Sequence, residues 1–510
     1  MSSIQIAGDT SGSITLSAPA VAGANTITLP AVTGTILTTA YTGDVTFGGT
    51  LTVTDDATIN GLTVGKGGGA VASATVVGNG AMAATNTGAV NSAFGQYALA
   101  ANTSGIGNTA LGNAAMFSNT TGYYNNAVGY AALYTNTTGV QNNAIGYLSL
   151  AYNTTGGNNT AVGHQALYDN TTGAANVALG HSALANNTTA NDNTAVGYSA
   201  LANNTTASNN VAVGYQALSS NTTASYNTSV GYQALLDNTT GAGNVALGFQ
   251  SLANNTTASN NIAVGYQALL DNTTGFQNVA LGHSALANNT TASNNTAVGY
   301  HALTTNTTGT SLTALGVNAL ANNTTANNNV AVGYNTLLTN TIGATNVAVG
   351  WQALYDNTTG SLNVAVGAEA LVNNTTASHN TAVGWQSLKT NTTGTNNVAL
   401  GNQALQANTT GSSNTVVGYQ ALYANTTGID NIVFGGNALD ANTTGNYNTA
   451  LGRYALSANT TANGNTAVGY QALLDNTTGS VNIAVGYQAL ANNTTGSNIT
   501  AVGYQAMLDN

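Results

Sequence analysis

The sequence predicts an all-β fold: an elongated β-solenoid, or β-roll, of 17-residue coils. First, a 17-residue pattern repeats without insertion from residue 74 to residue 510. Second, each repeat carries a glycine and a cluster of Asn and Thr, both of which oppose helix formation. Third, each repeat has two short apolar clusters bounded by turn-forming residues, which is typical of strands. Coils of this kind stack on one another and bury a continuous apolar column.

The repeat Asn261–Gln277 numbers the 17 positions, here called slots 1 to 17. Gly265 is slot 5, where we expect glycine to provide a backbone conformation or a close approach that a Cβ would block. Leu269, at slot 9, is expected to fill the core. Asn272, at slot 12, can bond to its own turn and form an amide ladder with the same residue of neighbouring coils. Thr274, at slot 14, is the other recurrent turn residue.

The two apolar clusters of this repeat are 262–264 and 268–269. The coil is therefore expected to run as strand, bend, strand and turn, with Val and Leu buried in the column. At about 4.8 Å per coil, 25 coils would form a slender rod about 120 Å long. Because no repeat contains an insertion, no loop is available to form a binding site, and this favours a shaft.

The N-terminal 73 residues lie outside the repeat. We expect an attachment segment at 1–42, and a short β segment with a glycine-rich junction at 43–73. Strands are predicted at 13–17, 25–30, 44–47, 50–54 and 57–64. Such thin strands bury little area alone, so strand exchange between identical chains is expected to stabilise them. The repeats occupy 74–510. The first lacks the slot-12 Asn and has Thr85 there, and the last is incomplete, which suggests a truncated chain.

Composition excludes several classes of function. Only 3% of residues are charged, against about 25% in ordinary globular proteins, and the net charge is −11. With three Lys and Arg residues in total, the chain has no basic patch for nucleic acid or an anionic membrane. It has no Cys, and no apolar run that approaches a transmembrane span. The start lacks the features of a secretory signal.

Slot 6 is rich in aromatic residues, which could form an exposed ladder along the rod. A stacked aromatic column can pack along the fold or bind sugar rings, and packing is the simpler interpretation. The ladder residues singled out are Tyr215, Tyr232, Tyr266, Trp351 and Trp385.

No metal, cofactor or catalytic site is predicted. His164 and His181 occupy slot 6 of adjacent coils and are the weak candidates for a metal pair, but no further ligand accompanies them. Calcium is not expected, because acidic residues at slot 11 are intermittent. Glu369 is the only Glu, and no set of nucleophile, base and orienting residue stands out, so we predict that the chain is not an enzyme.

The Asn-Thr-Thr triplet has two further interpretations. It is formally a glycosylation sequon, as at Asn272 and Asn289, although turn and ladder chemistry explains it without a modifying enzyme. An ice-binding plane would need Thr at alternate positions of a strand, whereas slots 13 and 14 are consecutive. At most one aligned Thr column is therefore expected.

Two groups of segments resemble bacteriophage and prophage tail-fibre-like proteins. The first comprises Ile6–Leu16, Ala18-Pro19-Ala20, Thr28-Leu29-Pro30, Gly43–Phe47 and Ile59–Val64. The second is the set of repeats of the form Asn-Thr-Ala-Val-Gly-Tyr-Gln-Ala-Leu, as at Asn465–Leu473. The Ala-Val-Gly core of the repeats is also similar to the trimeric β-roll head of autotransporter adhesins.

This resemblance implies an intertwined homotrimer that acts as a structural fibre in the virion. The shaft would space a host-recognition tip from the phage. Its partners would be itself, a tail or baseplate protein at the N-terminus, and a host-surface glycan or protein bound through a missing C-terminal tip. One alternative is a cellular extracellular filament or adhesin that polymerises through N-terminal strand complementation. A second is an ice-binding or glycan-binding solenoid.

Overall fold

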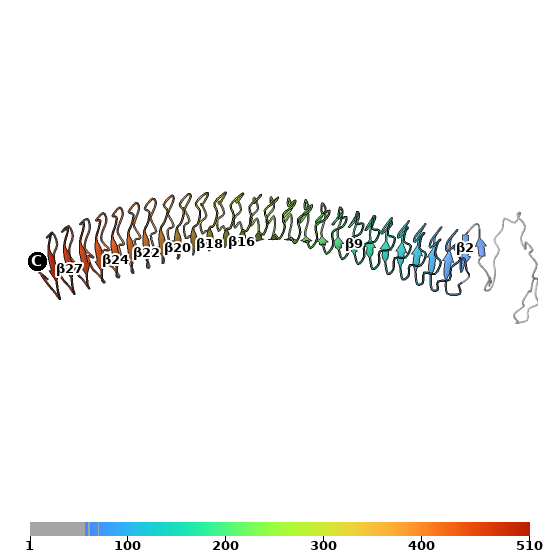
Figure 1. The fold of residues 1–510 in the computed structure, drawn as a ribbon, viewed down its shortest axis with the longest axis horizontal. Helices are drawn as coiled ribbons and strands as arrows, with labels where there is room; N and C mark the ends of the chain where they lie inside the picture. Colours follow the sequence, from blue (N-terminus) through green and yellow to red (C-terminus); the bar gives the residue numbers. More distant parts are fainter. Residues whose placement is uncertain (1–56, 60–61, 70, 510) are drawn as a thin grey trace, which may run out of the picture. The chain divides into compact units, whose positions relative to one another are not determined.

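The computed structural model describes residues 57–59, 62–69 and 71–509. The strands expected at 13–17, 25–30, 44–47 and 50–54 lie outside the described residues, as do the attachment segment 1–42 and its predicted strand exchange. Within the described part, the chain is all-β and has 28 strands in one sheet. The predicted solenoid of 17-residue coils is confirmed (Figure 1).

The strands are short and regularly spaced. From the N-terminal side they are β1 Ala57–Ile59, β2 Leu62–Gly65, β3 Thr75–Val77, β4 Ser92–Phe94, β5 Thr109–Leu111, β6 Asn126–Val128, β7 Asn143–Ile145, β8 Thr160–Val162, β9 Val177–Leu179, β10 Thr194–Val196, β11 Val211–Val213, β12 Thr228–Val230, β13 Val245–Leu247 and β14 Ile262–Val264. They continue as β15 Val279–Leu281, β16 Thr296–Val298, β17 Thr313–Leu315, β18 Val330–Val332, β19 Val347–Val349, β20 Val364–Val366, β21 Thr381–Val383, β22 Val398–Leu400, β23 Thr415–Val417, β24 Ile432–Phe434, β25 Thr449–Leu451, β26 Thr466–Val468, β27 Ile483–Val485 and β28 Thr500–Val502.

Each strand from β3 onward pairs in parallel with the strand one coil away. In β14 and β15, for example, Ile262 lies opposite Val279 and Ala263 opposite Ala280. This register is the 17-residue period itself, so identical slots stack directly on one another. A side chain within the stack therefore has a side chain of the same slot on each side. This stacking produces the ladders of Asn, Thr and aromatic side chains.

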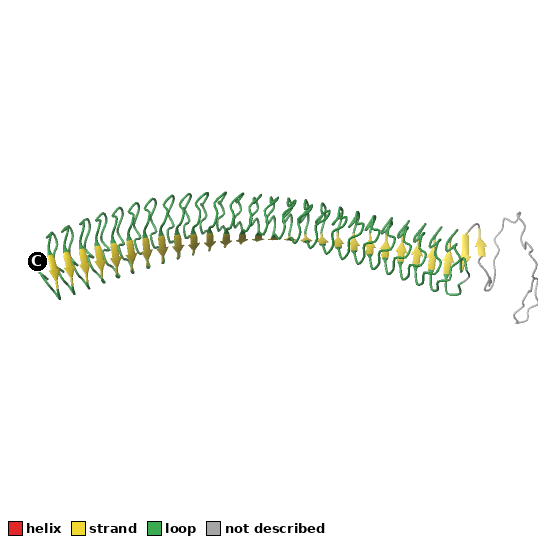
Figure 2. Ribbon diagram, in the orientation of Figure 1, coloured by secondary structure: helices red, strands yellow, loops and turns green. Residues whose placement is uncertain are grey.

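Each coil contains one strand, not the two expected (Figure 2). The predicted second strand at slots 8 and 9 is wrong, because the residues around it adopt left-handed backbone angles. Gln267 has φ of 51° and Leu269 has φ of 54°, values that no strand accommodates. Hydrogen bonds between coils nevertheless continue through this turn: Leu269 N donates to Ala285 O at 2.9 Å. The turn is thus held by inter-coil bonds without being a strand.

The strand ends at slot 5, where glycine is required. Gly265 has φ of 139°, a conformation that residues with a side chain rarely adopt. A Cβ on Gly265 would also lie 2.4 Å from the carbonyl oxygen of Gly282 in the next coil. Gly265 therefore has both the special backbone conformation and the close approach that the sequence predicts for slot 5.

The core of the coil is narrow and contains little besides Ala, Leu and Asn. In the reference repeat, Ala263, Ala268 and Leu269 are fully buried, together with two Asn side chains. The expectation that Val is buried is wrong for slots 2 and 4, because the middle residue of the strand is the one that faces inward. Ile262 and Val264 face outward. In most coils the slot-9 Leu is the only large apolar side chain in the core, and Leu312, Val416 and Val433 are buried additions to it.

The N-terminal edge of the stack is covered by the chain itself. The single strand expected at 57–64 is two strands, β1 and β2, which pair antiparallel with Ala57 opposite Val64. The sequence between them is Asn60-Gly61, a dipeptide that favours tight hairpin connections. β2 pairs in turn with β3, with Val64 opposite Val77, so the first coil does not leave its strand edge open.

Candidate functional site

An asparagine ladder at slot 12 runs through the whole stack. Asn272 Nδ2 donates to Asn255 Oδ1 at 3.0 Å and to Gly275 O at 2.9 Å. The same pair of bonds recurs in coil after coil up to Asn493. In the first repeat the ladder does not stop at Thr85, because Asn86, one residue further along, occupies the ladder position and accepts from Asn102 at 2.8 Å.

The possible glycosylation sites lie in this ladder. Asn272 and Asn289 are both completely buried. Asn289 Nδ2 donates to Asn272 Oδ1 at 2.9 Å and to Ala292 O at 2.9 Å. A glycan would replace a hydrogen that is donated inside the core, so in the folded coil neither Nδ2 is accessible to carry one.

A second asparagine ladder, at slot 1, was not anticipated. Asn278 N donates to Asn261 Oδ1 at 2.9 Å, and Asn261 Nδ2 donates to Gly275 O at 2.9 Å. The signal was present in the sequence as Asn at slot 1 of nearly every repeat, with Leu312 as an internal exception. Among the described side chains, no buried polar atom lacks a hydrogen-bond partner. The two ladders therefore make a core rich in amides tolerable.

The threonine positions divide into one half-buried and one exposed column. Thr273, at slot 13, donates its hydroxyl to Thr290 O of the next coil at 3.0 Å. Thr274, at slot 14, is exposed. The hydroxyl ladder thus runs through slot 13, and slot 14 presents the single aligned threonine column that consecutive positions allow.

Slot 6 forms an aromatic column on the surface. Its rings stack from coil to coil without a gap from Tyr130 to Tyr300, and again from Tyr470 to Tyr504. Tyr215 and Tyr232 are representative, with ring centroids 5.2 Å apart and planes 8° from parallel. The rings are about half exposed, 45% for Tyr266. Both faces of each ring within the column are covered by the neighbouring rings, so the ring edges are what contacts solvent.

The two tryptophans belong to the same slot but not to a continuous stack. Trp351 and Trp385 are two coils apart, and Ala368 occupies slot 6 between them. They are 47% and 46% exposed, and neither stacks on another ring among the described residues. Of the five ladder residues singled out from the sequence, Tyr215, Tyr232 and Tyr266 are therefore the stacked members.

His164 and His181 are part of the aromatic column. Their ring centroids are 4.7 Å apart with planes 7° from parallel, and Tyr147 and Tyr198 stack on the outer faces. Rings stacked in this way direct their nitrogen lone pairs along parallel planes, whereas a shared metal needs lone pairs that converge at about 2.0 Å. Among the described residues, no three His, Asp or Glu side chains come together. The geometry of the pair is that of ring stacking.

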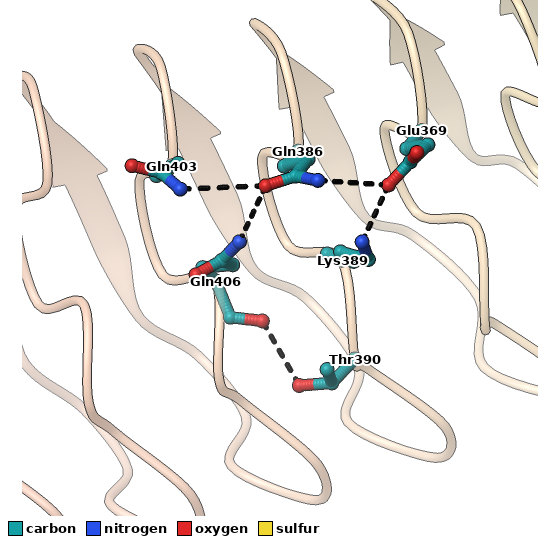
Figure 3. Close-up of polar contacts among 6 residues, drawn as sticks. All are labelled: Glu369, Gln386, Lys389, Thr390, Gln403 and Gln406. Carbon is teal, nitrogen blue, oxygen red and sulfur yellow. Dashed lines mark hydrogen bonds and ion pairs between the residues drawn. The ribbon is translucent and has the colours of Figure 1, made fainter.

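The only Glu in the chain takes part in a local charge cluster at slot 7 (Figure 3). Lys389 Nζ lies 2.5 Å from Glu369 Oε2, and Gln386 donates to the same oxygen at 2.9 Å. Gln403 and Gln406 in turn donate to Gln386 Oε1, so the carboxylate ends a chain of amides. The lysine holds the pKa of Glu369 below its usual range. The cluster ties neighbouring coils together and pairs the carboxylate of Glu369 with a lysine.

The outward surface of the parallel sheet, here called the outer face, differs from the prediction that slot 4 is buried. Every strand from β3 to β28 ends in Val, Leu, Ile or Phe at slot 4, and none of these side chains is buried. Leu247, Leu281 and Leu315 are 45%, 46% and 47% exposed. No strand of the described chain carries a charged residue. The signal in the sequence is the unbroken apolar slot 4, which the prediction of a buried Val column places in the core.

Exposure of this face is unusual for a parallel sheet. All-parallel sheets occur almost only where both faces are covered, and their strands then read as continuous apolar runs such as Ile262-Ala263-Val264. Here the turns of the coil cover the inner face alone. At slot 4 the outer face has the apolar residues of a covered surface and the exposure of an uncovered one, whereas slot 2 of the same face is Thr, Asn or Ser in many coils.

None of the described residues forms a helix of the length and apolar character needed to cross a membrane. Comparison with protein-family models, curated protein sequences and solved structures found no match to this chain.

Proposed function

We propose that this chain is a structural protein: the shaft of a homo-oligomeric, trimeric fibre. The observation that carries the proposal is the outer face, an uncharged surface that carries an apolar side chain at slot 4 of every coil from β3 to β28. Exposed apolar surfaces of this extent mark interfaces. A partner has to match a 17-residue period coil after coil, and a second copy of the chain has that period.

The rest of the fold is suited to a mechanical role. Asparagine and threonine ladders join each coil to the next along the described repeats, as at Asn272 and Thr273. No coil between β3 and β28 carries an inserted loop, so the cross-section is constant. Ladders that satisfy every buried amide give stiffness without charged residues or disulfides.

The resemblance to tail-fibre-like proteins supplies the biological setting of the proposal. In that setting the N-terminal segment attaches to a tail or baseplate protein, and the shaft spaces a host-recognition tip from the virion. In the cellular-filament alternative, the N-terminal strands of one chain complete the sheet of a neighbouring chain. Among the described residues, β28 pairs only with β27, so its outer edge is the one such strands would extend.

The test is native mass by light scattering, combined with negative-stain images of the same sample. A trimer would have a mass of about 151.5 kDa, three times the chain mass of 50.5 kDa, and its rods would be uniform in length. A mass of one chain would overturn the oligomeric shaft. Open filaments of variable length would favour the polymerising appendage instead.

A further inference from the structure

The longer run of the aromatic column ends at Tyr300, and a histidine lies against this last ring. Slot 6 of the next coil is Val317, so no aromatic residue follows Tyr300 in the stack. His301, at slot 7, stacks on Tyr300 with ring centroids 4.0 Å apart and planes 16° from parallel. Slot 7 is Gln in many coils, and His301 is the only histidine at this slot. The end of the column therefore carries a ring that the repeat itself does not require.

His301 also lies close to a second histidine, His283, in the preceding coil. Their ring centroids are 5.6 Å apart, with planes tilted by 45°. The backbone joins the same two residues, since His301 N donates to His283 O at 3.0 Å. With the backbone held by this bond, the His301 ring can leave its place by side-chain rotation alone.

The two imidazoles are held to different extents. His283 lies between Tyr266 and Tyr300, with ring centroids 4.9 and 5.1 Å from its own. Its Nδ1 also lies 3.0 Å from Ser284 Oγ, within hydrogen-bond distance. His301 is half-buried, and no described residue forms a hydrogen bond with its side chain. Of the two rings, His301 is therefore the one that is free to move.

Neither imidazole has a counter-charge. From residue 272 to residue 355 the chain contains no Asp, Glu, Lys or Arg, and the acids that bound this stretch are Asp271 and Asp356. Among the described residues, no carboxylate forms an ion pair with either histidine. The slot-7 neighbours of His301 are Ser284 and Asn318, both neutral, and the remaining titratable groups against the two rings are the flanking tyrosines. Two imidazolium ions here would therefore repel each other without compensation.

The charged form of His301 is disfavoured where the ring lies. An imidazolium on the face of Tyr300 would gain a cation–π attraction. Burial nevertheless lowers the pKa of His301 from its ordinary 6.5, and the neighbouring His283 lowers it further. The ring therefore packs in its neutral form. Its contribution to packing is complete above pH 6.5 and is lost as the pH falls through the lower pKa of the folded chain.

We propose that His301 is a pH-sensitive cap on the end of the aromatic column. While neutral, its ring packs on Tyr300; when His283 and His301 are both protonated, the His301 side chain rotates into solvent and exposes more of Tyr300. The rest of the column stays in place, because His283 remains between its two tyrosines. The cap does not depend on the shaft proposal, since slots 6 and 7 are not on the outer face.

The experiment is an NMR titration of the full chain, isotope-labelled at the Cε1 position of histidine, from about pH 8 to about pH 4. Wild type is compared with His283→Tyr, which removes one charge and places the commonest slot-6 residue in the column. The matched control is His181→Tyr. Residues 179–184 and 281–286 have the same sequence, and both histidines contact the serine that follows them.

Two further histidine signals make the titration readable. His301→Gln, which introduces the usual slot-7 residue, identifies the His301 resonance by its disappearance. His379 is exposed and belongs to no ring stack among the described residues, so it serves as the internal reference.

We expect the titration midpoint of His301 to be higher in His283→Tyr than in wild type by about 0.5 pH unit or more, and unchanged in His181→Tyr. The nuclear Overhauser contact between the His301 and Tyr300 rings should be present at neutral pH and lost below the midpoint. Equal midpoints in wild type and His283→Tyr, or a contact that persists at low pH, would overturn the proposal.

Backbone hydrogen exchange at low pH separates rotation of the ring from unfolding of the coil. We expect the amides around residue 301 to remain protected while the ring contact is lost. Loss of this protection together with the contact would also overturn the proposal, because the coil itself would then be opening. None of these results bears on the native mass, which tests the shaft proposal separately.

Discussion

The side-chain amide of Asn272 donates a hydrogen bond to Asn255 Oδ1 in the preceding coil, with a donor–acceptor distance of 3.0 Å. Both side chains are completely buried. Because the coils stack in register, each slot-12 asparagine from Asn102 to Asn476 has such a partner on each side, and the bonds polarise one another along the stack. The solenoid is held as much by buried amides as by apolar contact.

Replacement of Asn272 by Ala should therefore destabilise the stack locally. The change removes two donated bonds and takes away one of the two acceptors of Asn289 Nδ2, at a cost of about 1–3 kcal/mol. Hydrogen exchange of the backbone amides in the coils around residue 272 measures this loss of stability. Asn288→Ala is the control, because Asn288 is an exposed asparagine in the neighbouring coil. Equal protection in the two variants would mean that the ladder contributes nothing to stability.

Leu269→Ala tests the apolar part of the core. Leu269 is fully buried in a narrow cross-section that cannot collapse around a cavity, so we expect a loss of about 2–5 kcal/mol. Leu270→Ala is the comparison, since Leu270 is adjacent in sequence but only half-buried. Thermal unfolding followed by circular dichroism would show a much larger shift for Leu269→Ala. Similar shifts would contradict the placement of slot 9 in the core.

Gly265→Ala tests the requirement for glycine at slot 5. The backbone angle alone costs about 1–3 kcal/mol with a side chain, and the clash with Gly282 O adds to it. Gly436→Ala is a matched control at slot 6, where a Cβ would lie 3.8 Å from its nearest neighbour. The unfolding temperature should fall for Gly265→Ala and stay unchanged for Gly436→Ala. An unchanged Gly265→Ala would show that the coil can shift to accept a Cβ.

The sequence was sufficient for the period, the fold class and the ladder at Asn272, because these depend on residues that recur at fixed spacing. The prediction of a second strand at slots 8 and 9 is wrong. The left-handed conformation of Leu269 is imposed by inter-coil bonds, and the residue type gives no sign of it. The outer face was missed for a related reason. Val264 and Ala263 read as one apolar run, and only the direction of the strand decides which of them faces inward.

The Glu369–Lys389 pair should give a small pH dependence of stability. The pKa of Glu369 is lowered in the folded chain from its ordinary 4.5, so the stabilisation is complete above that value and disappears as the pH falls through the lower folded pKa. The side chains are 19% and 30% exposed, and such a pair contributes about 0.2–1 kcal/mol.

The measurement for this pair is the difference in unfolding temperature between wild type and Glu369→Gln, taken from neutral pH to below pH 4. We expect the difference to shrink as the pH falls. Asp237→Asn, at an exposed carboxylate, should show no such trend. A difference that stays constant across the range would mean that the ion pair does not stabilise the fold.

The central claim is that the outer face joins copies of the chain, and single-cysteine cross-linking tests it most directly. The chain contains no native Cys, so Val264→Cys places one thiol on the outer face and Thr274→Cys places one on the exposed turn. If copies pack in register through slot 4, mild oxidation will convert Val264→Cys to a covalent dimer on a denaturing gel. Thr274→Cys will remain a single chain. Cross-linking of Thr274→Cys, with Val264→Cys unlinked, would contradict the account.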